Sequence, residues 1–367
     1  MARFALKPLA MTAPSFRTLA DDFFVDEVVP PRTPQEGEHL HIRIEKRGLS
    51  TDEAVRAMAT AFGIAPAGVG RCGRKDVHAV TRQWLSFSGV SEVQLEGLDL
   101  PGLNVLESVR LPRKLRMGRF LGNRFRIRVR HLKPEECTRA EARLREAGLR
   151  GMRNAFGEQR FGKGGENTRI GRLLLCGDFE GALTRVALQE GPRVERIRGL
   201  LRAGRATDAL RILGRRRAGF YVSAHQADGF NRVLKERGED YDKARSGDLL
   251  HRHKSGRLLM IPDAGEAKRR VSTFELSPTG PLVGPRMQEV SEDALVIEQS
   301  VLANDPSPDP ANRRWFGCMG ARRPMRVPVT EIDSRMDGDD LSTFLELKFR
   351  LPPGAFATTL LKDVLEC

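Results

Sequence analysis

Four segments in the first third of the chain alternate apolar and polar residues, which is the period of a half-buried strand. They are 39–48 ("HLHIRIEKRG"), 82–87 ("RQWLSF"), 103–110 ("LNVLESVR") and 124–132 ("RFRIRVRHL"). In the last of them, apolar side chains lie on one face and arginines on the other. The alternation predicts a sheet built from these segments.

Helical periodicity and capping residues predict helices elsewhere. Residues 50–63 begin with Ser50 or Thr51 as N-cap, carry acids in the first turn and end at Gly63. A short amphipathic helix is expected from Thr138, its cap, to Gly148. The arginine-rich region 168–235 is expected to be largely helical. Beyond it we expect turns through "SPTGPLVGPRM" and then a capped helix, "SEDALVIEQSVLA".

Strand patterns return near the C-terminus, in "MRVPVTEI" and "STFLELKFRLP", and a terminal helix follows in "AFATTLLKDVLE". Strands at both ends with a helical block between them predict an α+β domain that is split by an inserted domain. The expected limits are 1–163 and 306–367 for the split domain and 164–305 for the insertion. The Pro/Asp-rich stretch "NDPSPDPANRR" marks the second boundary.

Composition narrows the class of protein. The chain has 367 residues, of which 40% are hydrophobic and 30% charged, as in ordinary globular proteins of two domains. No apolar run is long enough to span a membrane, and the first residues do not predict a signal peptide. The five cysteines are scattered without a C-x-x-C pair, so neither a zinc site nor a disulfide framework is indicated. We therefore expect a cytoplasmic protein.

The net charge of +14 indicates a polyanionic partner, of which nucleic acid is the usual one. An arginine-rich genome would also make a protein basic, but two segments concentrate the charge. Residues 110–130 hold nine cations and no acid, and residues 193–217 hold nine arginines and two acids. We interpret these two segments as phosphate-contacting surfaces, and the arginine face of 124–130 as RNA-facing rather than merely solvated.

Asp76 lies in "GRCGRKDVHAVTRQW", just before the strand predicted at 82–87. Gly70 and Gly73 predict an irregular segment there, so Asp76 belongs to a loop or a strand entrance among Arg74, Lys75 and other cations. This pattern fits a solvated turn with surface ion pairs. It also fits a carboxylate that is kept ionised for catalysis.

Two further segments are unusual, although each alone is a weak signal. The glycine-rich stretch "NAFGEQRFGKGGEN" (154–167) allows close approach of the backbone to a ligand, and its phenylalanines suit stacking on a base. The other, "LPPGAFATTLLKDVLE", places Phe356 near a helix start after a turn.

Together and in this order, the three segments resemble the TruD family of tRNA pseudouridine synthases. The first matches the G-x-K-D-x-x-A-x-T-x-Q block of that family, the second its N-x-F-G-x-Q-R-F-G block, and the third its P-x-G-x-F-A-T block. The resemblance covers nearly the whole chain. In two places the chain departs from the family pattern: Arg17 stands where many relatives have lysine, and "SAHQADGFN" lacks an arginine and a serine.

The resemblance implies an enzyme that isomerises a uridine of tRNA, usually at position 13, to pseudouridine. It implies that Asp76 is the catalytic residue, kept ionised by Arg74, Lys75 or a cation from another segment. Phe156 and Phe356 are expected to hold the flipped base, and Asn154 to hydrogen-bond Asp76 or a nearby backbone group. The full set of expected substrate-binding residues is Asn154, Phe156, Phe356, Lys75, Arg17 and Gln159.

The resemblance also implies a fold and a set of partners. The catalytic domain is expected to have a mixed, mainly antiparallel sheet with flanking helices, and the insertion to be a mainly helical α/β domain across a basic cleft. The reaction gains and loses no atoms, so we expect no cofactor and no metal. We expect tRNA as partner, no membrane, and a monomer.

Two other readings stay open. An RNA-binding protein without activity would keep the basic segments but would not need Asp76. A hydrolase could pair His78 with Asp76, which share a face two residues apart on a strand, although no Ser or Cys nucleophile motif accompanies them. Whether Asp76 attacks the ribose or the uracil ring is also open.

Overall fold

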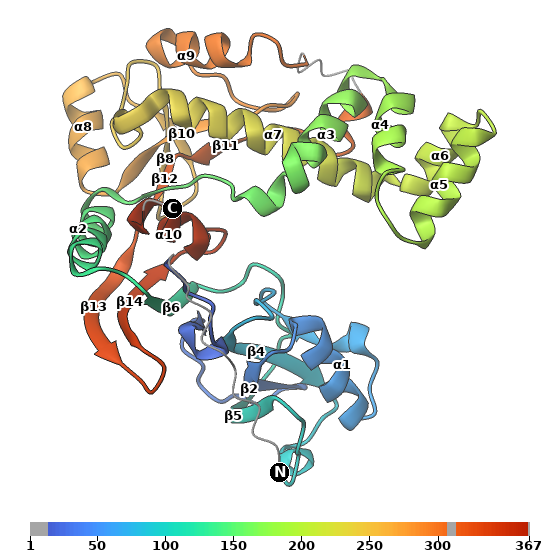
Figure 1. The fold of residues 1–367 in the computed structure, drawn as a ribbon, viewed down its shortest axis with the longest axis vertical. Coiled ribbons are helices and arrows are strands. Elements are labelled where there is room, and N and C mark those ends of the chain that lie inside the picture. The colour runs from blue at the N-terminus through green and yellow to red at the C-terminus, as the bar shows by residue number, and fades with distance from the viewer. Residues whose placement is uncertain (1–13, 307–312, 366–367) are drawn as a thin grey trace. The chain divides into compact units, whose positions relative to one another are not determined.

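A computed structural model describes residues 14–306 and 313–365 (Figure 1). The expected absence of a signal peptide concerns mainly residues 1–13, and the Pro/Asp-rich boundary includes 307–312, so both lie largely outside the described residues.

The chain divides into two compact units. Of the described residues, the first unit comprises 14–149, 328–357 and 361–365, and the second comprises 150–306, 313–327 and 358–360. The chain passes from the first unit to the second after residue 149 and returns to the first after residue 327. The domain limits expected at 163 and 305 stay a prediction.

The first unit is built on one sheet, in which strands from both ends of the chain are neighbours. Its order is β13-β14-β6-β1-β4-β2-β5, with β3 paired to β4, and only β1 and β4 are parallel. The prediction of a mixed, mainly antiparallel sheet from a split chain is therefore confirmed. The strands are β1 (Phe23–Val28), β2 (His39–Arg47), β3 (Gly70–Arg71), β4 (Val80–Ser88), β5 (Leu103–Leu111), β6 (Gly122–Arg130), β13 (Thr330–Gly338) and β14 (Thr343–Leu351).

Helix α1 (Thr51–Ala61) covers one face of this sheet over β2 and β4 (Figure 1). Of the two N-caps that the sequence offered, Ser50 and Thr51, the structure has Ser50, whose hydroxyl accepts from the amide of Glu53. Met58 and its apolar neighbours pack against Ile42 of β2 and Phe87 of β4. The apolar face of β2 and the apolar face of α1 therefore meet in one core.

Helix α2 (Pro134–Arg150) belongs to the first unit except for its last residue. Helix α10 (Ala357–Leu365) is divided, because Thr358–Leu360 belong to the second unit and the rest of the helix to the first. The predicted bounds of α2 were wrong at both ends. Thr138 lies inside the helix and donates to the carbonyl of Pro134, so it is not the cap. Gly148 also lies inside, where a β-carbon would come within 2.4 Å of Ile332, so this glycine serves packing rather than termination.

The arginines of β6 lie on the sheet face opposite to the buried Phe125, Ile127 and Val129, as predicted. Most of them, however, pair with acids from neighbouring strands and loops. These pairs are Arg124–Glu331 at 2.5 Å, Arg128–Glu346 at 3.4 Å, and Arg130–Asp22 and Arg130–Asp339, both at 2.7 Å. Arg126 instead lies over the ring of Phe24 at 4.8 Å. The interpretation of this face as an open RNA-facing surface gains no support from this pairing.

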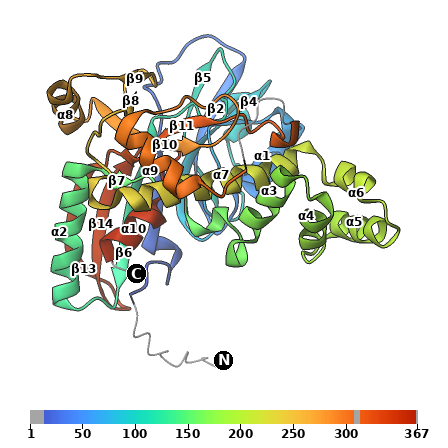
Figure 2. The ribbon, with the colours of Figure 1, turned by 90° about the horizontal axis from the view of Figure 1, so that it is seen from above.

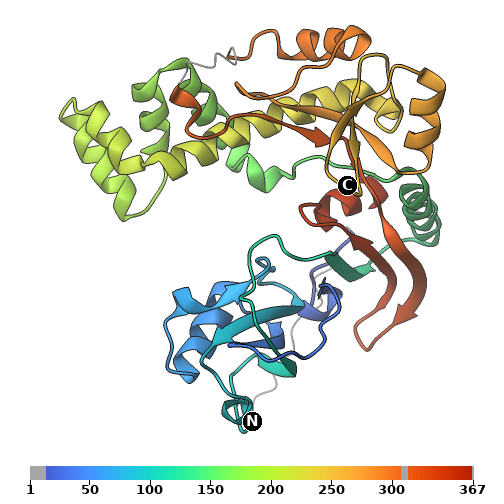
Figure 3. The same ribbon diagram turned by 180° about the vertical axis from the view of Figure 1, so that it is seen from behind.

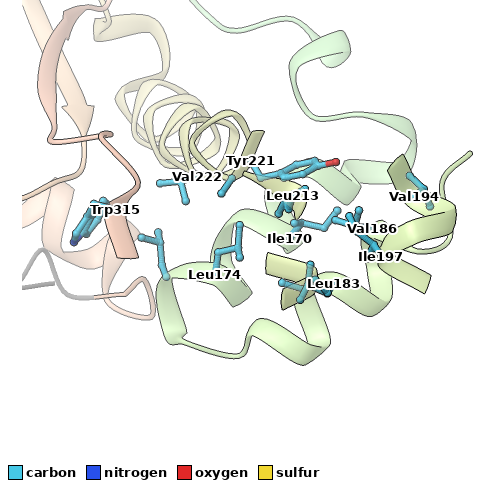
Figure 4. Packing of buried hydrophobic residues seen from close by; sticks show 14 residues of the cluster. Ile170, Leu174, Leu183, Val186, Val194, Ile197, Leu213, Tyr221, Val222 and Trp315 are labelled. Atoms are coloured by element: carbon cyan, nitrogen blue, oxygen red, sulfur yellow. The ribbon is translucent and has the colours of Figure 1, made fainter. Parts of the chain in front are cut away.

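The second unit has a helical part and a small sheet, with the long helix α7 (Arg215–Arg237) running through both (Figure 2). The helical part confirms the prediction for residues 168–235. Its other helices are α3 (Glu166–Cys176), α4 (Phe179–Val186), α5 (Pro192–Arg202) and α6 (Ala206–Leu213). They enclose a core around Ile170, Leu183 and Tyr221 (Figure 4).

The second unit contains a small sheet, as expected for an α/β insertion, but its strands were not located from the sequence, because turns were predicted for this region. Strand β10 (Leu276–Leu282) pairs with β8 on one side and β11 on the other, although Pro278 and Pro281 interrupt its donors. The remaining elements are β7 (Met152–Arg153), β8 (Leu249–Arg252), β9 (Leu258–Met260), β11 (Ala321–Pro324), β12 (Arg326–Val327), α8 (Ala264–Ser272) and α9 (Glu292–Leu302). Figure 3 shows the two helices α8 and α9, in orange, from behind. Helix α9 was predicted.

Among the described residues, no helix has the length and apolar character needed to cross a bilayer.

Candidate active site

Asp76 lies on the loop between β3 and β4, as the sequence predicted. The backbone of this loop is held by Lys46, a fully buried residue of β2. The ammonium of Lys46 donates to the carbonyl oxygens of Asp76 at 2.8 Å and of Leu49 at 2.5 Å. Burial lowers the pKa of Lys46 to about 8, against the opposing charges of Asp76 and Glu53.

A second contact fixes the loop one residue earlier. The amide of Lys75 donates to the hydroxyl of Thr51 at 2.9 Å, and that hydroxyl donates to the side chain of Gln83 at 2.9 Å. Thr51 begins α1 and Gln83 belongs to β4. The helix, the loop and the central strand are thereby joined beside Asp76.

The cation at the Asp76 carboxylate comes from another segment. Arg17 is 3.9 Å from Asp76, and its guanidinium lies over the ring of Phe23 at 4.7 Å. The Asp76 side chain is 55% exposed, so solvent and a substrate can reach it. The loop backbone is therefore anchored in the core while the carboxylate stays accessible.

The two neighbouring cations, Arg74 and Lys75, have other partners. Arg74 lies 3.4 Å from Asp52. The ammonium of Lys75 is almost fully buried, 2.9 Å from Glu27 and 2.6 Å from the side chain of Asn123. The substrate-binding role expected for Lys75 stays a prediction, and its contacts suit a structural role.

His78 is exposed, and no hydrogen bond joins it to Asp76 in the described part of the chain. The base-and-orienter pair of a hydrolase therefore finds no support here.

In the second unit, Asn154 is buried, and both polar atoms of its side chain form hydrogen bonds. Its amide nitrogen donates to the carbonyl of Pro324 at 2.8 Å, and its oxygen accepts from Arg323 at 2.5 Å. Arg323 also donates to the main-chain carbonyl of Asn154 at 3.1 Å. These contacts fit the expected backbone-fixing role of Asn154; the expected bond to Asp76 stays a prediction.

Phe156 follows two residues later and is half-buried. The guanidinium of Arg323 lies over its ring at 4.1 Å, and the ring of Phe230 meets it edge-on at 5.7 Å. Asn231 exchanges two hydrogen bonds with the Phe156 backbone, each of 2.9 Å. Burial and the charge of nearby Arg160 lower the pKa of Arg323 to about 10. The orientation of Phe156 is thus set by an arginine and an asparagine together.

The last two expected residues are exposed. Gln159 lies in a short helical turn, Glu158–Arg160, and Phe356 precedes α10 with 49% of its surface exposed. Exposure leaves both free for a ligand, and their roles stay predictions.

Sequence reasoning missed Lys46 and Arg323. Lys46 could have been found, because it continues the apolar face of Leu40, Ile42 and Ile44, where a lysine is out of place. Arg323 lies in "ARRPMR", where several arginines follow one another and no pattern singles one out.

Comparisons with known proteins agree along the whole chain. The family model of tRNA pseudouridine synthase D (TruD) matches residues 9–204 and 193–364. The tRNA pseudouridine synthase D of Geotalea daltonii is 37% identical over 387 residues, covering 96% of each chain, and that of Geobacter sulfurreducens is 34% identical over 400 residues, covering 100% of this chain and 97% of the relative. Among solved structures, the putative tRNA pseudouridine synthase D (TruD) of Methanosarcina mazei superposes with a TM-score of 0.81 at 25% identity, over 97% of this chain and 94% of that one. With its mainly antiparallel split sheet and these matches, the chain belongs to the tRNA pseudouridine synthase D family of isomerases.

Proposed function

We propose that this enzyme converts the uridine at position 13 of tRNA to pseudouridine, with Asp76 as its catalytic carboxylate. The observation that carries the proposal is the Asp76 loop. Its backbone is anchored by the buried Lys46, while the carboxylate is exposed and faces Arg17. A carboxylate in a fixed but accessible position is what a covalent step needs.

The reaction is an isomerisation. The bond between ribose C1′ and uracil N1 breaks, and a bond between C1′ and C5 forms. C5 loses a proton and N1 carries one in the product, so the composition of the nucleotide is unchanged. Asp76 acts in this scheme as the group that attacks either the ribose or the uracil ring.

Arg17 supports this role by its charge. Its guanidinium lies 3.9 Å from the Asp76 carboxylate, and the attraction between the two charges limits the directions in which the carboxylate points. The pair is exposed, and exposed pairs contribute only about 0–1 kcal/mol to stability. Its loss is therefore expected to affect chemistry more than folding.

Phe156 and Phe356 are our candidates for holding the flipped uracil, since a base that leaves its stack needs an aromatic or apolar surface. Arg323 and Asn231 support this assignment for Phe156, because they fix its ring and backbone before any ligand binds. Gln159 and Asn154 remain candidates for polar contacts beside it.

The test is Asp76→Asn, assayed with tRNA that carries tritium at uracil C5, since pseudouridine formation releases that tritium. We expect no release, unchanged tRNA affinity and an unchanged melting temperature. The matched control is Asp52→Asn, which removes a nearby exposed carboxylate that pairs with Arg71 and Arg74. Near-normal turnover by the Asp76 variant would remove this residue from the mechanism.

The position is tested separately. A tRNA in which uridine 13 is replaced by cytidine should release no tritium. Continued release would place the target at another uridine and leave the role of Asp76 intact.

A further inference from the structure

The two arginine-rich segments differ in how the fold treats their charge. In the first unit, acids from β13, β14 and neighbouring loops meet most arginines of β6. In the second unit, residues 179–217 contain ten arginines and four acids. This second segment therefore carries six more cations than acids, since ten minus four is six.

Four of those ten arginines have acidic partners. The pairs are Arg185–Glu166, Arg198–Glu195, Arg205–Asp208 and Arg211–Asp208. The other six have no ion pair with any described residue, and all but the half-buried Arg217 are exposed. They are Arg193, Arg196, Arg202, Arg215, Arg216 and Arg217, which together we call the α5–α7 arginines.

Folding alone does not explain these arginines. The core beneath them contains the apolar residues Val194, Ile197 and Leu213, which pack against other apolar residues. Arg215 and Arg216 stand in the first turn of α7, which contains no acid. Cations there oppose the helix dipole, so their placement slightly disfavours the helix.

An exposed aromatic residue accompanies this charge. Phe220 is 42% exposed and lies four residues after Arg216, on the same side of α7. Arg160 lies over its ring at 5.3 Å. Guanidinium groups beside an open aromatic ring are typical of surfaces that bind phosphates and unpaired bases of RNA.

We propose that the α5–α7 arginines, with Phe220, form a surface that binds the sugar-phosphate backbone of tRNA. The proposal rests on the proposed function, since it takes the same tRNA as ligand. It adds that this surface supplies affinity and not chemistry, because phosphate contacts position an RNA without selecting the reacting base. The match to the tRNA pseudouridine synthase D family favours RNA over an anionic membrane as the ligand.

The test compares two variants that lose the same charge from the second unit. The first, Arg196→Gln/Arg215→Gln/Arg216→Gln, changes three exposed α5–α7 arginines. The control, Arg257→Gln/Lys268→Gln/Arg269→Gln, changes exposed cations around β9 and α8 that also lack ion pairs with described residues. Affinity for unmodified tRNA is measured by fluorescence anisotropy at several salt concentrations, and turnover by tritium release at saturating tRNA.

We expect the first variant to bind tRNA more weakly, with a slope of log affinity against log salt that is shallower by about 2–3 units. Its turnover at saturation and its melting temperature should equal those of the wild type. Phe220→Ala should weaken binding without changing the salt slope. The control variant should keep the wild-type slope.

Equal slopes in both triple variants would overturn the proposal, because only net charge would then matter. Lost binding to anionic vesicles with unchanged tRNA binding would also overturn it and identify a membrane surface. The binding assay needs no turnover, so a failure of the proposed chemistry, seen with Asp76→Asn, is distinguishable from a failure of this surface.

Discussion

Lys46 shows how one buried charge can hold the backbone of a loop, here the loop that carries Asp76. Its ammonium has two main-chain carbonyls as acceptors and no carboxylate as ion-pair partner among the described residues. A buried charge is expensive unless its hydrogen bonds are satisfied. Stability alone therefore does not explain why a lysine stands here. One of its two acceptors is the carbonyl oxygen of Asp76. We infer that Lys46 is a positioning residue for the Asp76 loop.

Lys46→Met should lower turnover at saturating tRNA by about tenfold or more, because small displacements of a reacting group are costly in rate. Methionine keeps most of the volume but leaves the partly buried carbonyls of Leu49 and Asp76 without this donor, at about 1 kcal/mol each. We expect a lower melting temperature as well. Affinity for tRNA, measured by anisotropy, should stay within about threefold, since it rests on many phosphate contacts.

Lys46→Arg is the companion variant, which keeps the charge and the donors in a larger group. Partial recovery of turnover relative to Lys46→Met is expected. A methionine variant that melts earlier yet turns over at the wild-type rate would reduce Lys46 to a purely structural residue.

At the scale of elements, patterns of apolar and polar residues predicted the structure correctly where a strand or helix buries one face. The alternation of β2 and β6 and the start of α1 were predicted correctly, because burial and capping depend on residues close in sequence. Helix α2 was misjudged because Thr138 and Gly148 look like a cap and a stop. Gly148 is required because the side chain of Ile332, which is distant in sequence, leaves no room for a β-carbon there.

Strand β10 illustrates the opposite failure. Its two prolines and a glycine suggest turns, yet the residues from Leu276 to Pro281 are buried between β8 and β11. Similarly, nothing in the sequence near β6 predicts that Glu331 and Glu346 will lie beside its arginines. Register between distant strands is a tertiary property, so charge counted along the chain overestimates the charge on a face.

The β6 face gives a prediction at this scale. Arg124→Gln/Arg126→Gln/Arg128→Gln removes three cations, but Glu331 and Glu346 then lose arginine partners. Because two of the three arginines are already neutralised within the fold, the salt slope of tRNA binding should change by less than about 1 unit. The melting temperature should fall instead. A slope shallower by 2–3 units would restore this face as an RNA-binding surface.

For the whole molecule, the three sequence blocks and the basic character are enough to indicate the right family, because the blocks are specific and their order along the chain is fixed. Functional detail is harder to predict from sequence. Arg17 was named from the resemblance, and its position near Asp76 depends on how β1 lies beside β4. Arg323 lies 169 residues from Asn154 in sequence, so only the fold brings the two together.

The net charge of +14 leads to the last prediction, which concerns how the enzyme selects its substrate. If affinity comes mainly from phosphates, a tRNA without the target uridine should bind almost as well as the substrate. Such a tRNA, with cytidine at position 13, should inhibit tritium release competitively, with an inhibition constant close to the KM of the substrate. Both constants should rise in parallel with salt, while kcat stays constant.

Parallel behaviour would mean that selection occurs after binding, when the target base leaves its stack and reaches the site, since only then do bases of different chemistry interact differently with the protein. The contrary result is an inhibition constant far above KM at low salt. It would mean that the protein reads bases during binding, and that the exposed aromatic residues, Phe220 and Phe356, contribute to recognition before the reaction begins.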